Sequence, residues 1–215
     1  MLYIYCAGAL GKEVYDLSLR NKHNKEQILF VDDLKYGDHF TSDKVPIVSE
    51  DTLFERFTKD DKVIIASGEP ALREKIYKRL TEHDLEFETL IDKTVPISKS
   101  AFLGEGLIIF EFCSISSDAH LNNNVLINRQ SIVGHDINIG ESTVISSTVN
   151  IGGGVSIGNC SYIGMGATIK EGLKIGNNSI LSMGSVLFRD LSDDIIAMGN
   201  PARTILKNKD RKIFK

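Results

Sequence analysis

The sequence contains no tryptophan, only four prolines and three cysteines among its 215 residues. Cys6, Cys113 and Cys160 are odd in number and lack C-x-x-C spacing, which argues against a disulfide framework or a zinc site. Positive charge is also scarce: a net charge of −4 provides no basic field for nucleic acid or an anionic membrane. No apolar run approaches the ~18 residues of a membrane span, and the N-terminus lacks a basic n-region. We therefore expect a cytoplasmic protein.

Glycine is abundant and unevenly placed. Of its 18 occurrences, four fall in residues 1–96 and fourteen in residues 97–215. Two compositions indicate two architectures, so we predict a domain boundary near Pro96. The predicted division is an α/β domain over 1–96, a repeat domain over 97–189, and a capping segment with a basic tail over 190–215.

A six-residue repeat dominates the second region. From Ile97 to Leu187, every sixth residue is Ile, Leu or Val, which gives sixteen positions without an insertion. This period fits neither an amphipathic helix nor an alternating strand. It fits a short strand and a turn, repeated around a triangular prism with 18 residues per coil. The pattern predicts an all-β left-handed parallel β-helix.

The first region alternates strand and helix patterns, which predicts a parallel sheet covered on both sides, a half-Rossmann-like α/β domain. Strands are expected at residues 2–5, 27–31, 62–67 and 86–91, and helices at residues 12–21 and 69–83.

The turn after the first strand has some features of a phosphate-binding loop. Gly8 and Gly11 open the first helix, and Asp32 and Asp33 end the second strand, where an acid can bind a ribose hydroxyl. The full G-x-G-x-x-G pattern is absent because Cys6 holds its first position. A mononucleotide or nucleotide-sugar therefore suits the loop better than NAD. The alternative is that both glycines only form a tight turn.

His135 and Asp136 follow a turn glycine and are expected at a corner of the prism. A histidine there suits a general base, and the acid could fix its tautomer. Gly153 lies 18 residues on, one coil above His135, where its N–H could polarise a thioester carbonyl. His120 precedes His135 by 15 residues, not by one coil, which disfavours a metal-dependent hydrolase. The alternative is that His135 is an ordinary surface histidine.

Several motifs appear together in one order and carry a resemblance across nearly the whole chain. They are Ile4-Tyr5-Cys6-Ala7-Gly8-Ala9-Leu10-Gly11, Phe30-Val31-Asp32-Asp33, Ile65-Ala66-Ser67-Gly68 with Arg73, the hexapeptide array, Gly134-His135-Asp136 and Gly199-Asn200-Pro201-Ala202. The sequence resembles the bacterial nucleotide-sugar acetyltransferases of the bacillosamine-pathway N-acetyltransferase type, which are related to the sialic acid O-acetyltransferases. The resemblance implies acetyl-CoA as donor and a UDP-linked 4-amino-4,6-dideoxy sugar as acceptor. From the histidine spacing we expect no metal. It also implies a homotrimer with sites between subunits, acting in bacterial surface-glycan or glycoprotein sugar biosynthesis.

The same resemblance implies roles for single residues. His135 is the general base, with Asp136 raising its basicity, and Gly153 donates its backbone N–H to the acetyl carbonyl. The remaining positions are Asn128 near the acceptor sugar, Met165 and Met183 in the CoA groove, and Gly8, Ala9, Leu10, Asp32 and Asp33 at the nucleotide.

Two positions depart from the family pattern. Val144 stands where members commonly carry a histidine that contacts acetyl-CoA, and Leu10 replaces a histidine of the glycine loop. The basic tail (Lys207, Lys209, Arg211, Lys212 and Lys215) could meet the CoA 3′-phosphate or could simply be solvated. O-acetylation of a sialic acid or another sugar is an alternative function. A non-catalytic nucleotide-sugar binding protein is an alternative of another class.

Overall fold

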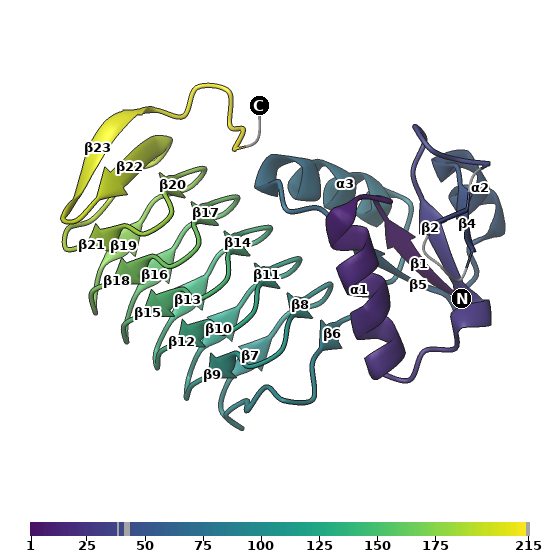
Figure 1. Cartoon of the computed structure of the whole chain (residues 1–215), viewed down its shortest axis with the longest axis horizontal. Coiled ribbons are helices and arrows are strands. Elements are labelled where there is room, and N and C mark those ends of the chain that lie inside the picture. The colour runs from purple at the N-terminus through teal and green to yellow at the C-terminus, as the bar shows by residue number, and fades with distance from the viewer. Residues whose placement is uncertain (38, 41–43, 214–215) are drawn as a thin grey trace.

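The computed structural model describes residues 1–37, 39–40 and 44–213. Figure 1 shows an α/β region beside a stack of short parallel strands. The α/β sheet has the strand order β3-β4-β2-β1-β5, with all neighbours parallel except β3 and β4. Its strands are β1 (Leu2–Tyr5), β2 (Ile28–Val31), β3 (His39–Phe40), β4 (Val45–Val48) and β5 (Lys62–Ile65).

Helices cover both faces of this sheet because its strands are apolar on both sides. Leu2 and Ile4 pack on the side of α1 (Ala9–Arg20), whereas Tyr3 and Tyr5 pack with α2 (Glu50–Arg56) and α3 (Pro70–Glu82). A short 3₁₀ helix, η1 (Lys25–Gln27), leads into β2. The predicted α/β fold class is confirmed.

The segment predicted as a strand at 86–91 does not join this sheet along its whole length. Phe87 makes one parallel bridge to Val63 of β5, but β6 (Leu90–Ile91) pairs with β8 of the repeat region. The chain therefore passes from one sheet to the next ahead of Pro96, and the boundary near that residue stays a prediction.

The repeat region is the predicted left-handed parallel β-helix, with three flat faces of two-residue strands. The first face contains β8 (Ile108–Ile109), β11 (Leu126–Ile127), β14 (Val144–Ile145), β17 (Tyr162–Ile163) and β20 (Ile180–Leu181). The second contains β9 (Ser114–Ile115), β12 (Ile132–Val133), β15 (Asn150–Ile151), β18 (Thr168–Ile169) and β21 (Val186–Leu187). The third contains β7 (Phe102–Leu103), β10 (His120–Leu121), β13 (Asn138–Ile139), β16 (Ser156–Ile157) and β19 (Lys174–Ile175).

The sixteen periodic aliphatic residues form the interior of the prism. Fourteen of them are buried, and Ile97 and Leu103 at the open end are partly buried. Strand partners lie 18 residues apart on every face, as between Val133 and Ile151. Burial of this column stabilises the region, since buried apolar surface contributes about 25 cal/mol per Å². Its register also fixes which side chains meet from coil to coil.

The α/β region packs against the first face of the prism. Ile108, Leu126 and Val144 point outward from that face and share one apolar cluster with Val14 and Tyr15 of α1. Val144, at the family's histidine position, is therefore buried beneath α1, with 3% of its surface exposed. In this chain that position is therefore part of the packed contact between the two regions and is not exposed.

A hairpin closes the far end of the prism and leads into the tail. It consists of β22 (Ile195–Gly199) and β23 (Ala202–Lys207), with β22 adding to the first face beside β20. The chain then returns toward α3 (Figure 1), where the Ile213 N–H donates to the Glu69 carboxylate at 3.0 Å. Lys215 of the predicted basic tail lies outside the described residues.

Candidate active site

His135 lies at the corner between the second and third faces, as its place after the turn glycine predicts. It follows β12, and the chain reaches β13 after Asp136 adopts a positive φ of 54°. The Asp136 N–H donates to the Ser117 carbonyl of the preceding coil at 3.0 Å. The corner backbone is thus held by its neighbour while the His135 side chain remains 65% exposed.

The imidazole of His135 is oriented by the adjacent carboxylate. Its Nδ1 lies 2.7 Å from Asp136 Oδ2. A carboxylate only accepts hydrogen bonds, so in neutral His135 the proton belongs on Nδ1. Nε2 is then left with its lone pair, which is the arrangement that a general base requires.

Gly153 lies directly against the imidazole, one coil above. A Cβ added at Gly153 would come within 2.4 Å of His135 Nε2, a distance that no side chain can occupy. Among the described residues, no acceptor bonds the Gly153 N–H. A basic nitrogen and an available amide donor therefore share one exposed corner. A carbonyl bound there could be polarised while a nearby amine is deprotonated.

The other predicted site residues of the prism lie at a different corner. Met165 and Met183 follow β17 and β20 at the corner between the first and second faces, and their side chains are 57% and 77% exposed. Asn128 follows β11 at the same corner, where its Oδ1 accepts the Arg129 N–H at 2.9 Å. One chain therefore holds these residues and His135 at opposite ends of its second face.

The predicted nucleotide loop surrounds the start of α1. Cys6 has a positive φ of 80°, and a Cβ at Gly11 would lie 2.5 Å from the Cys6 carbonyl, so Gly11 permits the close approach of helix and strand. Gly8 precedes α1 without a side-chain cap. The first N–H groups of this 12-residue helix are consequently directed toward an open site, which suits an anion.

Two lysines complete this site, and neither was predicted from the sequence. A cavity of about 400 Å³ is lined by Ala7, Gly8, Ala9, Lys12, Glu13 and Lys35. Lys35 donates from Nζ to the Ala7 carbonyl at 2.6 Å, across 28 residues of sequence. Lys12 could have been found from its place in the first helical turn, but nothing local to Lys35 marks it.

The two acids after β2 have different surroundings. Asp32 accepts the N–H of Ala7 at 3.0 Å and so supports the loop beside the cavity. Asp33 accepts the Glu50 N–H at 2.8 Å, at the first residue of α2. Leu10 lies in the first turn of α1, but it does not line the cavity that contains Gly8 and Ala9.

An ion-pair network connects the cavity at the predicted nucleotide loop to the prism. Glu13 at the cavity pairs with Arg129 at 2.9 Å, and Arg129 also pairs with Glu111. Arg20 of α1 extends the network to Glu111 at 3.1 Å and to Asp92 at 2.8 Å. Asn128, beside Arg129, is thereby on the same side of the molecule as the cavity. The predicted nucleotide loop and the predicted acceptor position are thus linked through the ion pair of Glu13 and Arg129.

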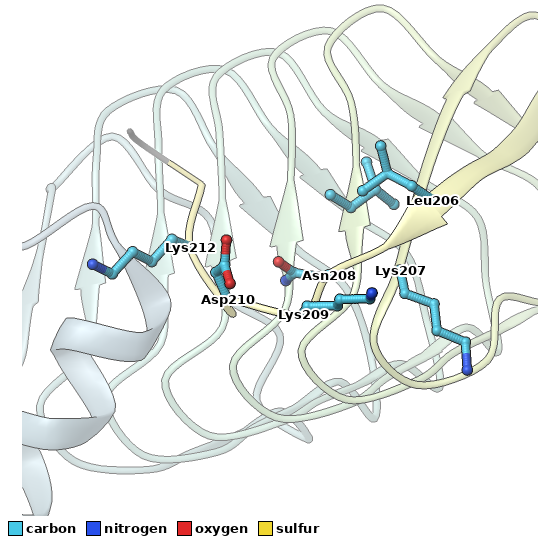
Figure 2. Close-up of a pocket in the computed structure, with 7 residues that line it drawn as sticks. Leu206, Lys207, Asn208, Lys209, Asp210 and Lys212 are labelled. Atoms are coloured by element: carbon cyan, nitrogen blue, oxygen red, sulfur yellow. The ribbon is translucent and has the colours of Figure 1, made fainter.

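The basic tail borders a second cavity, of about 670 Å³. It is lined by Ile196, Leu206, Lys207, Asn208, Lys209, Asp210 and Lys212. Figure 2 shows Lys207 and Lys212 pointing away from one another. Asn208 binds the Asn178 carbonyl at 2.8 Å, which places the tail at the edge of the first face opposite Met183. The tail is thus remote from the residues predicted to line the CoA groove.

Two further features bear on the expected chemistry. No group of three or more His, Cys, Asp or Glu in the described ranges could hold a metal ion. Within the same ranges, no helix is long and apolar enough to span a membrane.

Comparisons with known proteins agree with this geometry. Residues 1–80 match the PglD N-terminal domain, and residues 154–189 match the bacterial transferase hexapeptide (six repeats). No protein with a curated description matches the sequence.

Solved structures match nearly the whole chain. PerB from Caulobacter crescentus, in complex with CoA and GDP-perosamine, is 26% identical, with 95% of this chain and 96% of that chain covered and a TM-score of 0.86. WeeI from Acinetobacter baumannii is 27% identical, with 95% and 99% covered and a TM-score of 0.88. The acetyltransferase domain of PglB from Neisseria gonorrhoeae is 25% identical, with 95% and 98% covered and a TM-score of 0.88.

The predicted resemblance to the nucleotide-sugar acetyltransferases is therefore confirmed. The chain is an enzyme of the acyltransferase class, in which a PglD-type N-terminal domain precedes a hexapeptide-repeat β-helix. The roles of its single site residues remain predictions.

Proposed function

We propose that this enzyme transfers the acetyl group of acetyl-CoA to the amino group of a UDP-linked 4-amino-4,6-dideoxy sugar. The observation that carries the proposal is the corner where His135 Nε2 meets Gly153, with Asp136 on the opposite ring nitrogen. The related PerB structure contains CoA and GDP-perosamine, which supports the donor and the amino-sugar class. The uridine base follows from the family resemblance. Acetyl-CoA and nucleotide sugars are cytoplasmic metabolites, so we place the enzyme there.

The reaction is a direct transfer. The sugar amine attacks the thioester carbonyl, and the carbonyl oxygen gains negative charge that the Gly153 N–H can stabilise. His135 Nε2 takes the proton that the nitrogen loses as the C–N bond forms. The C–S bond then breaks, and the same proton neutralises the departing thiolate to give CoA. Asp136 keeps Nδ1 protonated, so that Nε2 is the atom that accepts.

A complete site needs more than one chain. Asn128 and the nucleotide cavity lie at one end of the second face, and His135 lies at the other. The six intervening residues would span about 20 Å in extended chain. A homotrimer would bring the His135 corner of one subunit to the Asn128 corner of its neighbour. Exposed apolar residues along this surface, Ile132, Met165 and Met183, support such a contact.

The test is turnover by His135→Ala, measured as free CoA release with UDP-, GDP- and dTDP-linked 4-amino sugars. We expect a loss of about 10²–10⁴-fold, the usual contribution of a general base. The matched control is His120→Ala, which removes an exposed histidine packed on Phe102 of the third face and should leave the rate unchanged.

Near-normal turnover by His135→Ala would remove this residue as the base. A wild-type enzyme that acetylates free or CMP-linked sialic acid, and no amino sugar, would favour O-acetylation instead. The absence of any thermal shift with CoA would favour the non-catalytic alternative.

A further inference from the structure

Arg73 is a charged side chain that the proposed reaction does not use. It lies in α3, its surface is 0% exposed, and it is the largest fully buried side chain among the described residues. Burial lowers the pKa of its guanidinium to about 9, so the group stays protonated at neutral pH. No carboxylate within the described ranges pairs with it. A buried charge held only by neutral oxygens calls for an explanation, because an apolar pair would often give equal or better stability.

The guanidinium joins the two regions of the molecule. On the α/β side, Nη1 donates to the carbonyls of Ile65 and Ser67, the latter at 3.0 Å. On the prism side, Nε and Nη2 donate to the Asn124 carbonyl at 3.1 and 2.9 Å, and Nη2 also donates to Asn124 Oδ1 at 2.7 Å. One side chain thus makes five hydrogen bonds, and three of them cross the domain contact to Asn124.

Asn124 returns the interaction from the prism. It is 0% exposed at a corner, with a φ of 57°, and its Nδ2 donates to the Arg73 carbonyl at 3.2 Å and to Ser142 Oγ at 2.8 Å. Arg73 therefore binds both the backbone and the side chain of Asn124, and Asn124 in turn binds the backbone of Arg73. We call Arg73 and Asn124 the interdomain joint.

The interdomain joint borders the predicted nucleotide loop. Ile65 ends β5, which is the sheet neighbour of β1, and Cys6 directly follows β1. Burial raises the pKa of Cys6 to about 12, while the charge of Arg73 acts in the opposite direction. The interdomain joint consequently connects the end of β5, beside the predicted nucleotide loop, to the β-helix. Hydrogen bonds from a guanidinium are directional, so they resist movement of one region relative to the other.

We propose that Arg73 and Asn124 are positioning residues for the nucleotide-linked acceptor: they fix the nucleotide loop relative to the prism, so that a bound sugar presents its amine to the base. This proposal rests on the proposed function. Because acetyl-CoA is expected to bind the prism alone, a loosened joint should weaken use of the acceptor and spare use of the donor.

Two variants loosen the joint. Asn124→Gly removes the amide without straining a corner that has positive φ, and Arg73→Lys keeps the charge but cannot span both domains. For both we expect the KM for the nucleotide sugar to rise about tenfold or more, with the KM for acetyl-CoA within about twofold. Asn124→Asp keeps an acceptor for Arg73 and should restore most of the loss.

The matched control is Arg79→Gln, on the same helix. Arg79 pairs with Glu50 and Tyr5 inside the α/β region, so its loss should leave both KM values unchanged. A folded Asn124→Gly enzyme with a normal KM for the nucleotide sugar would overturn the proposal. So would an equal rise in both KM values.

Failure of the proposed function would be seen separately, as wild-type enzyme that acetylates none of the amino sugars. The joint would then be tested by hydrogen exchange at Leu90 and Asp92, whose N–H groups bond to the prism. Faster exchange there in Asn124→Gly, and not in Arg79→Gln, is expected. Unchanged exchange would overturn the joint itself.

Discussion

The second residue after each periodic aliphatic residue has opposite roles at two corners of the prism. At the corner between the third and first faces, backbone N–H groups are bonded by side chains of the next coil: Glu141 by Asn159, Asn159 by Asn177, and Asn177 by Asp193. At the corner between the second and third faces, the equivalent positions hold His135 and Gly153, and the Gly153 N–H has no partner in the described chain. Where each backbone N–H is bonded, the corner stabilises the repeat. Where an N–H has no partner in the described chain, it is available to a ligand.

Among the changes that test this comparison while keeping His135, the largest effect should come from closing the open corner. In Gly153→Ala, the new Cβ would collide with His135 Nε2 and displace the ring. We expect turnover to fall by about 100-fold, the usual result of a misplaced catalytic group, with little change in melting temperature. Glu171→Ala, one coil further along the same corner, is the control and should keep its rate. Normal turnover in Gly153→Ala would show that this contact is not part of the site.

Asp136→Asn should have the next largest effect. Asparagine tolerates the positive φ of Asp136, but its amide no longer requires a proton on His135 Nδ1. Turnover should therefore fall about tenfold, while the KM for acetyl-CoA stays constant. Steady-state kinetics at several pH values measure the effect. An unchanged rate would mean that the 2.7 Å contact has no role in turnover.

At the self-bonded corner, the expected loss is in stability. Asn159→Ala deprives the Glu141 N–H of its acceptor at 2.9 Å, which should lower the free energy of unfolding by about 1 kcal/mol. Turnover at 25 °C should be unaffected. Asn150→Ala removes an exposed asparagine with a long 3.4 Å bond and should cost less than Asn159→Ala. Equal losses in a denaturant titration would contradict the difference between the corners.

The smallest effect concerns the ion-pair network of α1, which lies outside both corners. Burial alone would raise the pKa of Asp92, but hydrogen bonds from Thr94 and Arg20 outweigh it, so the pKa is below the usual value. A lowered carboxyl pKa adds stability above about pH 3.9, the unfolded value, and that stability is lost as pH falls through the folded pKa. Arg20→Gln should therefore reduce the loss between pH 5 and 3 by about 1 kcal/mol or less. Thermal unfolding at these two pH values measures it, and an unchanged pH dependence would contradict the pairing.

The β-helix could be predicted in full because its signal is local and repeated. Sixteen aliphatic positions set the register, and the register alone places Gly153 over His135. The α/β region was predicted less completely. β4 contains Pro46, which obscures its strand pattern, and α2 has only seven residues. Lys35 at the loop and Arg73 at Asn124 depend on contacts across 28 and 51 residues, for which a single sequence has no signal.

The path of the tail and the crossing of residues 86–91 between sheets could not be predicted, for one shared reason. Both depend on which surfaces meet after the two regions fold. Nothing in the sequence indicates that the Glu69 carboxylate accepts the Ile213 N–H. The strand pattern before Pro96 likewise does not indicate that β6 pairs with β8. The structure is therefore most predictable where one coil determines the next, and least predictable where two independent layers come into contact.

The 18-residue register also limits how this chain can change in length. A whole coil inserted beyond Glu171 would lengthen the prism by one strand spacing, about 4.8 Å, and leave His135 over Gly153. The same insertion between Asp136 and Gly152 would give His135 a different neighbour, although the core would remain equally well filled. A coil added beyond this site would leave its geometry unchanged, although the bond between Ile213 and Glu69 would then be lost or remade. The coil between His135 and Gly153 must be inherited intact.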